Sequence, residues 1–302
     1  MDIRAELAPR SKVVATLPMG SPVEIVGRKR RSVRVHAGGG VEGWTHETEL
    51  ISAQTRSQVR SLVRLVADDA SQGVMRAFDI LNVHLEPNRE SPTIYQLEAD
   101  EEADLLGQKW VRRLGSESAE CWRLVRLASG DAGWALASRL YPAIPVEVAQ
   151  YAEGRRITSY FDLGSVYDES LGENRPTWLW TQIAGGNSRD DFDRFRVFRW
   201  SKSRDAYQTI KLERDLRGSL PVRVERSDAS DGEGSVFSIH LEKDGRWFLR
   251  SYRVEGQRVV SIGETPAGPP RDFSGPPDIA PNRDSAPVGL QQRLLEWWKR
   301  PS

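Results

Sequence analysis

The strongest constraint on the fold of this chain is a motif that occurs twice. Residues 42–50 read EGWTHETEL and residues 132–140 read AGWALASRL, so in both a Gly-Trp pair is followed, after five intervening positions, by Leu. A motif that recurs together with its flanking pattern predicts two copies of one structural unit. The organisation of nearly half the chain therefore depends on what this unit is.

The match extends upstream of the two Gly-Trp pairs. VEIVG at 23–27 aligns with ADLLG at 103–107, and SVRV at 32–35 aligns with WRLV at 122–125. The second copy holds a ten-residue insertion between these blocks, around KWVRRLGSESAEC. Insertions are tolerated best in hairpin loops, because the entropic cost of closing a loop rises slowly with its length. We therefore expect the insertion to lie in a hairpin.

Each copy consists of short segments that alternate in polarity and are separated by turn residues. In SPVEIVGRKR, for example, Val23 and Ile25 share one parity, while Glu24 and Val26 share the other. Period-two alternation predicts strands, and segments such as AGGG at 37–40 predict turns. About five short strands in about 60 residues bury little apolar area as an open sheet, whereas a small barrel also removes exposed edges. We therefore predict a small β-barrel for each copy.

These motifs resemble those of the bacterial SH3 domains. The second copy supplies VHLEPNRESPTIYQL, ADLLG, WRLV and AGWALASRL, and the first supplies AELAPRSKVVATL, VEIVG, SVRV and EGWTHETEL. The resemblance covers roughly residues 3–52 and 80–145. The first copy departs from the pattern by placing Ser32 where the second has Trp122, which leaves the first barrel less aromatic surface for stacking.

The segments RRITSYFDLGSV and WLWTQI, which follow the second copy, resemble the order found in a group of bacterial SH3-domain proteins. That resemblance implies a secreted or envelope-anchored protein and implies no particular activity. The chain starts MDIRAELAPRSKVVATL, without the apolar stretch and cleavage site of a signal peptide. We therefore expect a periplasmic or cell-envelope protein whose signal segment is absent from this sequence, or alternatively a cytoplasmic protein.

The segment between the two copies predicts a connecting helix. TRSQVRSLVRLVADDAS at 55–71 places Val59, Leu62 and Val66 at helical spacing, and Gly73 follows as a stop signal. The resulting apolar stripe is expected to dock on one of the two barrels.

The remaining sequence predicts a third β unit and a tail. Residues 150–263 alternate in polarity and include turn signals at Asp244-Gly245 and Glu255-Gly256, which predict an antiparallel sheet or barrel. The chain then becomes Pro-rich and ends in VGLQQRLLEWWKRPS, a short amphipathic pattern. The overall prediction is a mainly-β chain with a first SH3-like barrel at 1–53, a helix at 54–73, a second barrel at 74–148, a third β domain at 149–264, a Pro-rich linker at 265–287 and a C-terminal helix at 288–302.

Two groups of aromatic residues are candidates for binding. Tyr95, Trp110 and Trp122 of the second barrel could line a groove for a peptide or glycan, or could pack in the core instead. In the tail, Leu294, Trp297 and Trp298 are candidates for binding a partner. The tail helix could equally dock on the protein's own β domains or lie on a membrane surface.

Composition and spacing argue against several other classes of function. Lys+Arg and Asp+Glu are both 43, so no net positive charge attracts nucleic acid, and no apolar run is long enough for a transmembrane helix. The single Cys121 precedes a strand pattern, whereas a nucleophilic Cys usually opens a helix. No spacing typical of metal ligands or of nucleotide binding occurs, so we expect no metal and no cofactor.

The sequence therefore predicts a non-enzymatic binding or scaffolding protein of the bacterial cell envelope. Its expected partner is a peptide, peptidoglycan or a protein, recognised through the SH3-like modules. One alternative is a structural adaptor that is itself recognised through its Pro-rich tail and terminal helix. The other is a hydrolase within 149–264, although no set of ionisable residues in that range has the spacing of a catalytic site.

Overall fold

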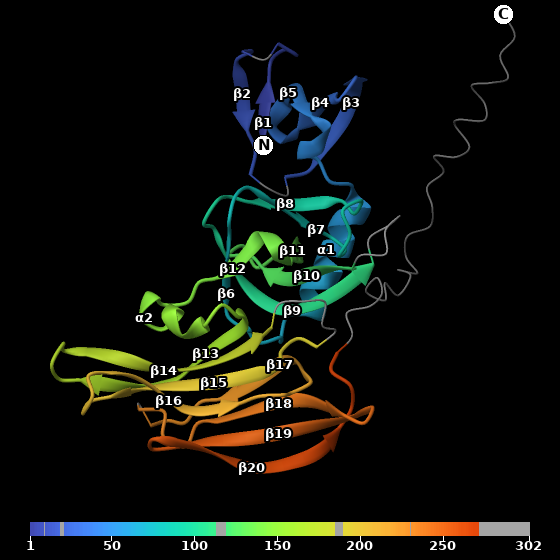
Figure 1. Cartoon of the computed structure of the whole chain (residues 1–302). Coiled ribbons are helices and arrows are strands. Elements are labelled where there is room, and N and C mark those ends of the chain that lie inside the picture. The colour runs from blue at the N-terminus through green and yellow to red at the C-terminus, as the bar shows by residue number, and fades with distance from the viewer. Residues whose placement is uncertain (9, 19–20, 113–118, 185–189, 230, 272–302) are drawn as a thin grey trace, which may run out of the picture. The chain divides into compact units, whose positions relative to one another are not determined.

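The computed structural model describes residues 1–8, 10–18, 21–112, 119–184, 190–229 and 231–271. Strands make up 56% of the structure and helices 11%, which confirms the prediction of a mainly-β protein. Within the described ranges, all strands pair antiparallel and form four sheets (Figure 1). The chain forms two compact units, Met1–Ser57 and Gln58–Ser302.

The first unit is a sheet of five short strands in the order β2-β1-β5-β4-β3. Alternation along one of them, Ser32–Ala37, sends Val33, Val35 and Ala37 into the core around Ile3, and the residues between them face the other way. The strands are β1 (Asp2–Arg4), β2 (Val13–Thr16), β3 (Val23–Lys29), β4 (Ser32–Ala37) and β5 (Val41–His46), with 3₁₀ turns η1 (Gly38–Gly40) and η2 (Glu47–Glu49).

The predicted connecting helix is α1 (Ala53–Leu65). Ser52 precedes it, and its Oγ accepts a hydrogen bond from Thr55 N at 2.9 Å, as the side chain of a helix N-cap does. Leu62 and Val66 are buried against the second copy of the repeat, so the apolar stripe docks on a β module as predicted.

The helix ends at Leu65 rather than near Gly73, where the sequence placed its stop. Gln72 N donates to Leu105 O at 2.6 Å, and Leu105 N donates to Gly73 O at 2.8 Å. The backbone at Gln72 and Gly73 is therefore already engaged with a strand of the second copy. Arg126 also reaches the end of the helix, where its guanidinium donates to Asp69 O at 3.1 Å.

The second copy of the repeat has the same strand order as the first. Its strands β8-β7-β11-β10-β9 correspond in sequence to β2-β1-β5-β4-β3, and β6 and β12 extend the sheet beyond β9. The two copies therefore share one strand order. These elements are β6 (Val74–Ala77), β7 (Leu81–His84), β8 (Thr93–Leu97), β9 (Glu102–Arg112), β10 (Ala119–Arg126), β11 (Ala132–Leu136), the 3₁₀ turn η3 (Ala137–Arg139) and β12 (Leu140–Pro142).

The ten-residue insertion lies in the hairpin between β9 and β10, as expected. β9 has 11 residues where β3 has 7, and the ladder with β10 continues to the pair Arg112 and Ala119. Residues 113–118, in the middle of the insertion, lie outside the described ranges.

The two Gly-Trp glycines have a common structural cause. A Cβ atom on Gly43 would lie 2.5 Å from Arg4 O, and one on Gly133 would lie 2.9 Å from His84 O. In each copy, the strand that carries Gly-Trp approaches β1 or its counterpart β7 too closely for any side chain. The adjacent Trp44 and Trp134 pair with Arg4 and His84, respectively.

The third β region consists of two four-stranded meanders rather than one sheet. Both faces of β15 are buried: Phe195 packs edge-on against Phe237 and Tyr252 of the other meander, while Phe198 packs against Trp180. The elements are α2 (Val146–Ala149) with the 3₁₀ turn η4 (Gln150–Ala152), the meander β13 (Arg156–Asp168), β14 (Glu173–Ile183), β15 (Arg194–Ser201) and β16 (Ala206–Glu213), and the meander β17 (Gly218–Glu225), β18 (Val236–Lys243), β19 (Arg246–Glu255) and β20 (Arg258–Ala267).

The last strand enters the segment that was predicted to be a linker. β20 continues to Ala267, with Pro266 opposite Phe248. Because β20 is an edge strand, Pro266 can lack its N–H without breaking the ladder. The predicted helix at 288–302 lies outside the described residues.

The second repeat copy and the two meanders belong to the same compact unit. The Gln72 side chain bonds both backbone groups of Val222: Nε2 donates to its carbonyl at 3.2 Å, and Oε1 accepts from its N–H at 2.8 Å. Gln108 Nε2 of β9 donates to the buried carboxylate of Asp191 at 2.8 Å. These buried polar contacts join the module to the meanders.

Candidate functional site

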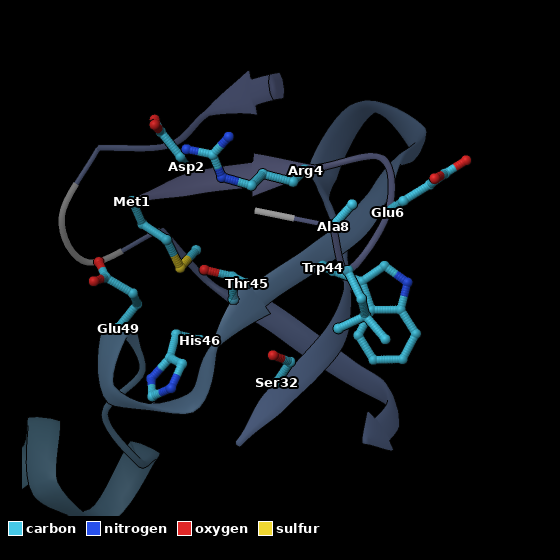
Figure 2. Close-up of a pocket in the computed structure, with 11 residues that line it drawn as sticks. Met1, Asp2, Arg4, Glu6, Ala8, Ser32, Trp44, Thr45, His46 and Glu49 are labelled. Atoms are coloured by element: carbon cyan, nitrogen blue, oxygen red, sulfur yellow. The ribbon is translucent and has the colours of Figure 1, made fainter. Parts of the chain in front are cut away.

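The candidate site is a pocket of about 500 Å³ in the first unit. It is formed by β1, by the loop that follows β1, by the start of β4, by the end of β5 and by η2 (Figure 2). Its lining residues are Met1, Asp2, Arg4, Glu6, Leu7, Ala8, Ser32, Trp44, Thr45, His46 and Glu49.

The strand register explains why three of these side chains meet. Ser32 pairs with His46 across β4 and β5, and Arg34 pairs with Trp44. Because side chains alternate along a strand, Ser32, Trp44 and His46 share the face that points away from the core. Figure 2 shows Ser32 with His46 on one side and Trp44 on the other.

Hydrogen bonds fix several side chains of the wall. Arg4 donates to Ser11 O at 2.9 Å, and Asp2 Oδ1 accepts from Thr16 Oγ1 at 2.7 Å. The Nδ1 atom of His46 lies 2.7 Å from Thr48 Oγ1. The wall is therefore partly organised before any ligand arrives.

The charged side chains around the pocket are mostly acidic. Asp2, Glu6 and Glu49 supply three carboxylates, and Arg4 supplies one guanidinium. A half-buried aromatic ring, Trp44, lies among them. This combination of an aromatic surface with an acidic rim suits a ligand that has an apolar group and neutral or basic neighbours.

The pocket geometry gives no reason to assign covalent chemistry to it. Ser32 and His46 are cross-strand neighbours, but the described contacts of the imidazole place its Nδ1 against Thr48 rather than Ser32. A serine nucleophile needs a hydrogen bond from its hydroxyl to a base. Within the described part of the chain, no group of three or more His, Cys, Asp or Glu residues is placed to hold a metal ion.

The aromatic residues predicted to bind in the second copy have different environments. Trp122 is 3% exposed and packs with Leu62, Val66 and Trp134, in agreement with the interpretation of this residue as part of the core. It therefore cannot line an open groove in this structure.

Tyr95 and Trp110, the other two candidates of that group, are half-buried. Tyr95 OH donates to Glu101 Oε1 at 2.8 Å, and this hydrogen bond raises the pKa of the tyrosine. A ligand-binding role for these two residues stays a prediction. The tail residues Leu294, Trp297 and Trp298 lie outside the described ranges.

The single cysteine lies in the interior. Cys121 is buried on β10, and burial raises the pKa of its thiol to about 11. A thiol with such a pKa is protonated at neutral pH, whereas a nucleophilic cysteine requires the thiolate. Its environment is thus that of a structural residue.

Sequence reasoning did not find the pocket, although its signal was visible. The alignment showed Ser32 in the place of Trp122 and was interpreted as a loss of stacking surface in the first copy. In the structure, the small side chain also leaves space between Trp44 and His46. A large-to-small difference between the two copies therefore coincides with the candidate pocket.

Comparisons with family models, with curated proteins and with solved structures found no match. Among the residues whose placement the structure gives, no helix is both long enough and apolar enough to cross a membrane.

Proposed function

We propose that this protein is a non-enzymatic binding or scaffolding protein of the bacterial cell envelope, which recognises a wall peptide or a protein partner through SH3-like modules. The resemblance of the two repeat copies to bacterial SH3 domains supports the module type and the compartment. The common strand order of the two copies is consistent with that resemblance, because both copies are small all-β modules.

The observation that carries this proposal is that one face of the module is open in the first copy and closed in the second. In the first copy this face contains the pocket beside Trp44. In the second copy the equivalent face is covered by the α1 segment, that is, α1 together with Val66 directly after it, through the side chains of Leu62 and Val66. We therefore assign recognition to the first copy, and attachment to the rest of the unit to the second.

Binding experiments with the full chain test this proposal. Purified peptidoglycan sacculi are sedimented with the protein, and a peptide array is probed with the same preparation. We expect one of the two to retain the protein, sacculi if the partner is a wall peptide and array peptides if it is a protein. Retention by neither overturns the proposal.

Two variants locate the binding surface. Trp44→Ala removes the ring of the pocket and is expected to weaken retention at least about tenfold, as loss of a central aromatic residue commonly does. Trp110→Ala changes the second copy and should leave retention intact. The reverse result, in which Trp110→Ala is no longer retained and Trp44→Ala is retained like the wild type, would assign recognition to the second copy. Circular dichroism melting confirms that each variant is folded.

A further inference from the structure

We propose that the pocket of the first unit receives one aromatic side chain from a partner polypeptide, which takes the place that Trp122 fills in the second copy. This inference rests on the proposed function, because it assumes that the first unit binds a polypeptide. It adds the chemical identity of the group that is recognised.

The strand registers place Ser32 and Trp122 at equivalent positions. Ser32 pairs with His46 across β4 and β5, and Trp122 pairs with Leu136 across β10 and β11. The neighbouring pairs are equivalent too, since Arg34 pairs with Trp44 as Leu124 pairs with Trp134. The two side chains therefore leave corresponding sheets at the same point and on the same face.

The groups that hold the indole of Trp122 have counterparts in the pocket wall. His84 packs edge-on against Trp122 with ring centroids 5.5 Å apart, and Trp134 lies in the same cluster. Arg4 and Trp44 stand at the equivalent places of the first unit, and both line the pocket. The second copy thus shows, within the same chain, how an aromatic ring is seated on this face.

The space available fits such a group. Sites for small molecules are typically about 300–1,000 Å³, and the pocket measures about 500 Å³. An indole or phenyl ring would fill part of it and leave room for the flanking backbone. A ring held between Trp44 and the stem of Arg4 gains both buried apolar area and stacking.

Solvent exposure differs between equivalent residues of the two copies. Val26 and Leu106 are the bulged residues of equivalent strands, β3 and β9. Val26 is 49% exposed, whereas Leu106 is 3% exposed beneath the α1 segment. Leu7, which lines the pocket, is 39% exposed, so an incoming polypeptide finds apolar surface at the pocket itself.

The acidic rim sets the charge of the preferred segment. Asp2, Glu6 and Glu49 outnumber Arg4, so basic residues next to the aromatic one are favoured over acidic ones. The preferred motif is accordingly an aromatic residue flanked by Lys or Arg.

Three matched peptides test the inference on the full chain. They carry Lys-Trp-Lys, Lys-Ala-Lys and Glu-Trp-Glu between acetylated and amidated alanines, and saturation-transfer NMR with calorimetry measures their binding. We expect Lys-Trp-Lys to bind at least about tenfold more tightly than Lys-Ala-Lys, a ratio that corresponds to about 1.4 kcal/mol. Glu-Trp-Glu should fall between the two.

A filled-pocket variant provides the decisive comparison. Ser32→Trp inserts the residue found in the second copy and should reduce Lys-Trp-Lys binding at least about tenfold, because its own indole occupies the site. Ala128→Trp adds the same side chain at an exposed turn and should leave binding unchanged. Trp44→Ala serves as a second variant if Ser32→Trp does not fold, and it should weaken binding as well.

The outcomes separate this inference from the proposed function. Equal binding of Lys-Trp-Lys and Lys-Ala-Lys, or undiminished binding by Ser32→Trp, overturns the aromatic receptor. If array peptides or sacculi still bind in that case, the proposed function stands. Absence of binding to every peptide and to sacculi overturns both.

Discussion

The two repeat copies are built on the same inner framework but have opposite outer faces. Both copies have the same five-strand order, a bulge at the equivalent strand, and a glycine where two strands cross. On the outer face, the second copy has Leu124 and Trp134 beneath a helix, whereas the first has Arg34 and the pocket beside Trp44. Repeats can therefore keep the residues that define the fold while the outer face changes from packing to recognition.

The difference has an energetic consequence. A fully buried large apolar side chain contributes about 1.5–3 kcal/mol relative to an exposed one, so the helix-covered face adds substantially to the second copy. The exposed pair of Arg34 and Glu42 on the first copy, 3.0 Å apart, contributes at most about 1 kcal/mol. The first unit depends on its small inner core around Ile3, Val33 and Val35.

The largest effect is expected from Trp122→Ala. This change removes a buried ring beneath the α1 segment, and deletions of this size cost about 3–5 kcal/mol of unfolding free energy. Urea unfolding followed by circular dichroism measures the loss. Ser32→Ala, the control at the equivalent position, should cost less than about 0.5 kcal/mol. Similar costs for the two variants would contradict the assigned difference between the faces.

The shared glycines should give equal effects in the two copies. A Cβ atom at position 133 would lie 2.6 Å from Val83 Cγ1 and 2.9 Å from His84 O, and one at position 43 would lie 2.5 Å from Arg4 O. We expect Gly133→Ala and Gly43→Ala each to cost about 3 kcal/mol, the upper end for overpacking, because backbone atoms cannot move aside easily.

Hydrogen exchange followed by mass spectrometry assigns each of these losses to a unit. Gly43→Ala should accelerate exchange within residues 1–57 only, and Gly133→Ala within the other unit only. An unchanged unfolding free energy at either glycine would show that the two strands are farther apart than these distances imply. Gly130→Ala would not be a suitable control, since Gly130 has a positive φ of 85°. Gly38→Ala is suitable, because a Cβ atom there meets no neighbour within 4 Å.

Local patterns in the sequence predicted much of the fold. The offsets between the copies, the alternation of β4 and the hairpin signal at Asp244-Gly245 all reflect short-range physics, and the structure has strands and turns at those places. The helix end and the start of the linker were predicted less well. The backbone of Gln72 bonds to Leu105 instead of continuing the helix, and Pro266 lies opposite Phe248 in an edge strand. Neither partner is close in sequence.

The candidate site was harder to predict because it depends on a small side chain, Ser32, at a position where the other copy has a large one. The sequence left Trp122 with two interpretations, binding in a groove or packing in the core, since a large aromatic residue serves either role. Burial of Trp122 depends on Leu62 and Val66, and the periodicity of the helix did not say which copy of the repeat it would cover. The alignment already placed Ser32 opposite Trp122, but the space beside Ser32 is lined by residues of β1, β5 and η2 that only the fold brings together.

A smaller effect should follow from breaking the joint between the second copy and the meanders. Gln72→Ala leaves the buried N–H and C=O of Val222 without their partner, which costs about 1–3 kcal/mol. Hydrogen exchange of the Val222 amide should accelerate in this variant, because its hydrogen-bond acceptor is gone. Gln96→Ala, which removes an exposed bond to Asn82, is the matched control and should cost less than about 0.5 kcal/mol. If the Val222 amide stays protected in Gln72→Ala, this contact does not hold the joint.

The smallest effect is a pH dependence that belongs to the second unit. His240 of β18 is buried, which lowers the pKa of its imidazole, although the contact of Nδ1 with Pro221 O partly opposes the shift. On acidification below about pH 6.5, the unfolded chain binds a proton at His240 that the folded chain does not yet bind. The contribution of His240 to the unfolding free energy is therefore fully present above that pH. It falls as the pH approaches the lower pKa that His240 has in the folded state.

The variant His240→Gln isolates this contribution. The difference in unfolding free energy between wild type and variant should shrink as the pH falls from about 7.5 to about 5.5, because only the wild type carries the titrating group. Carboxylates with lowered pKa values, such as Glu153 and Glu264, lose their contribution at more acidic pH, and their effect cancels in this difference. A difference that is constant over this range would mean that His240 protonates equally well in the folded and unfolded chains. Such a result would leave the second unit with no loss of stability from His240 between about pH 7.5 and about pH 5.5.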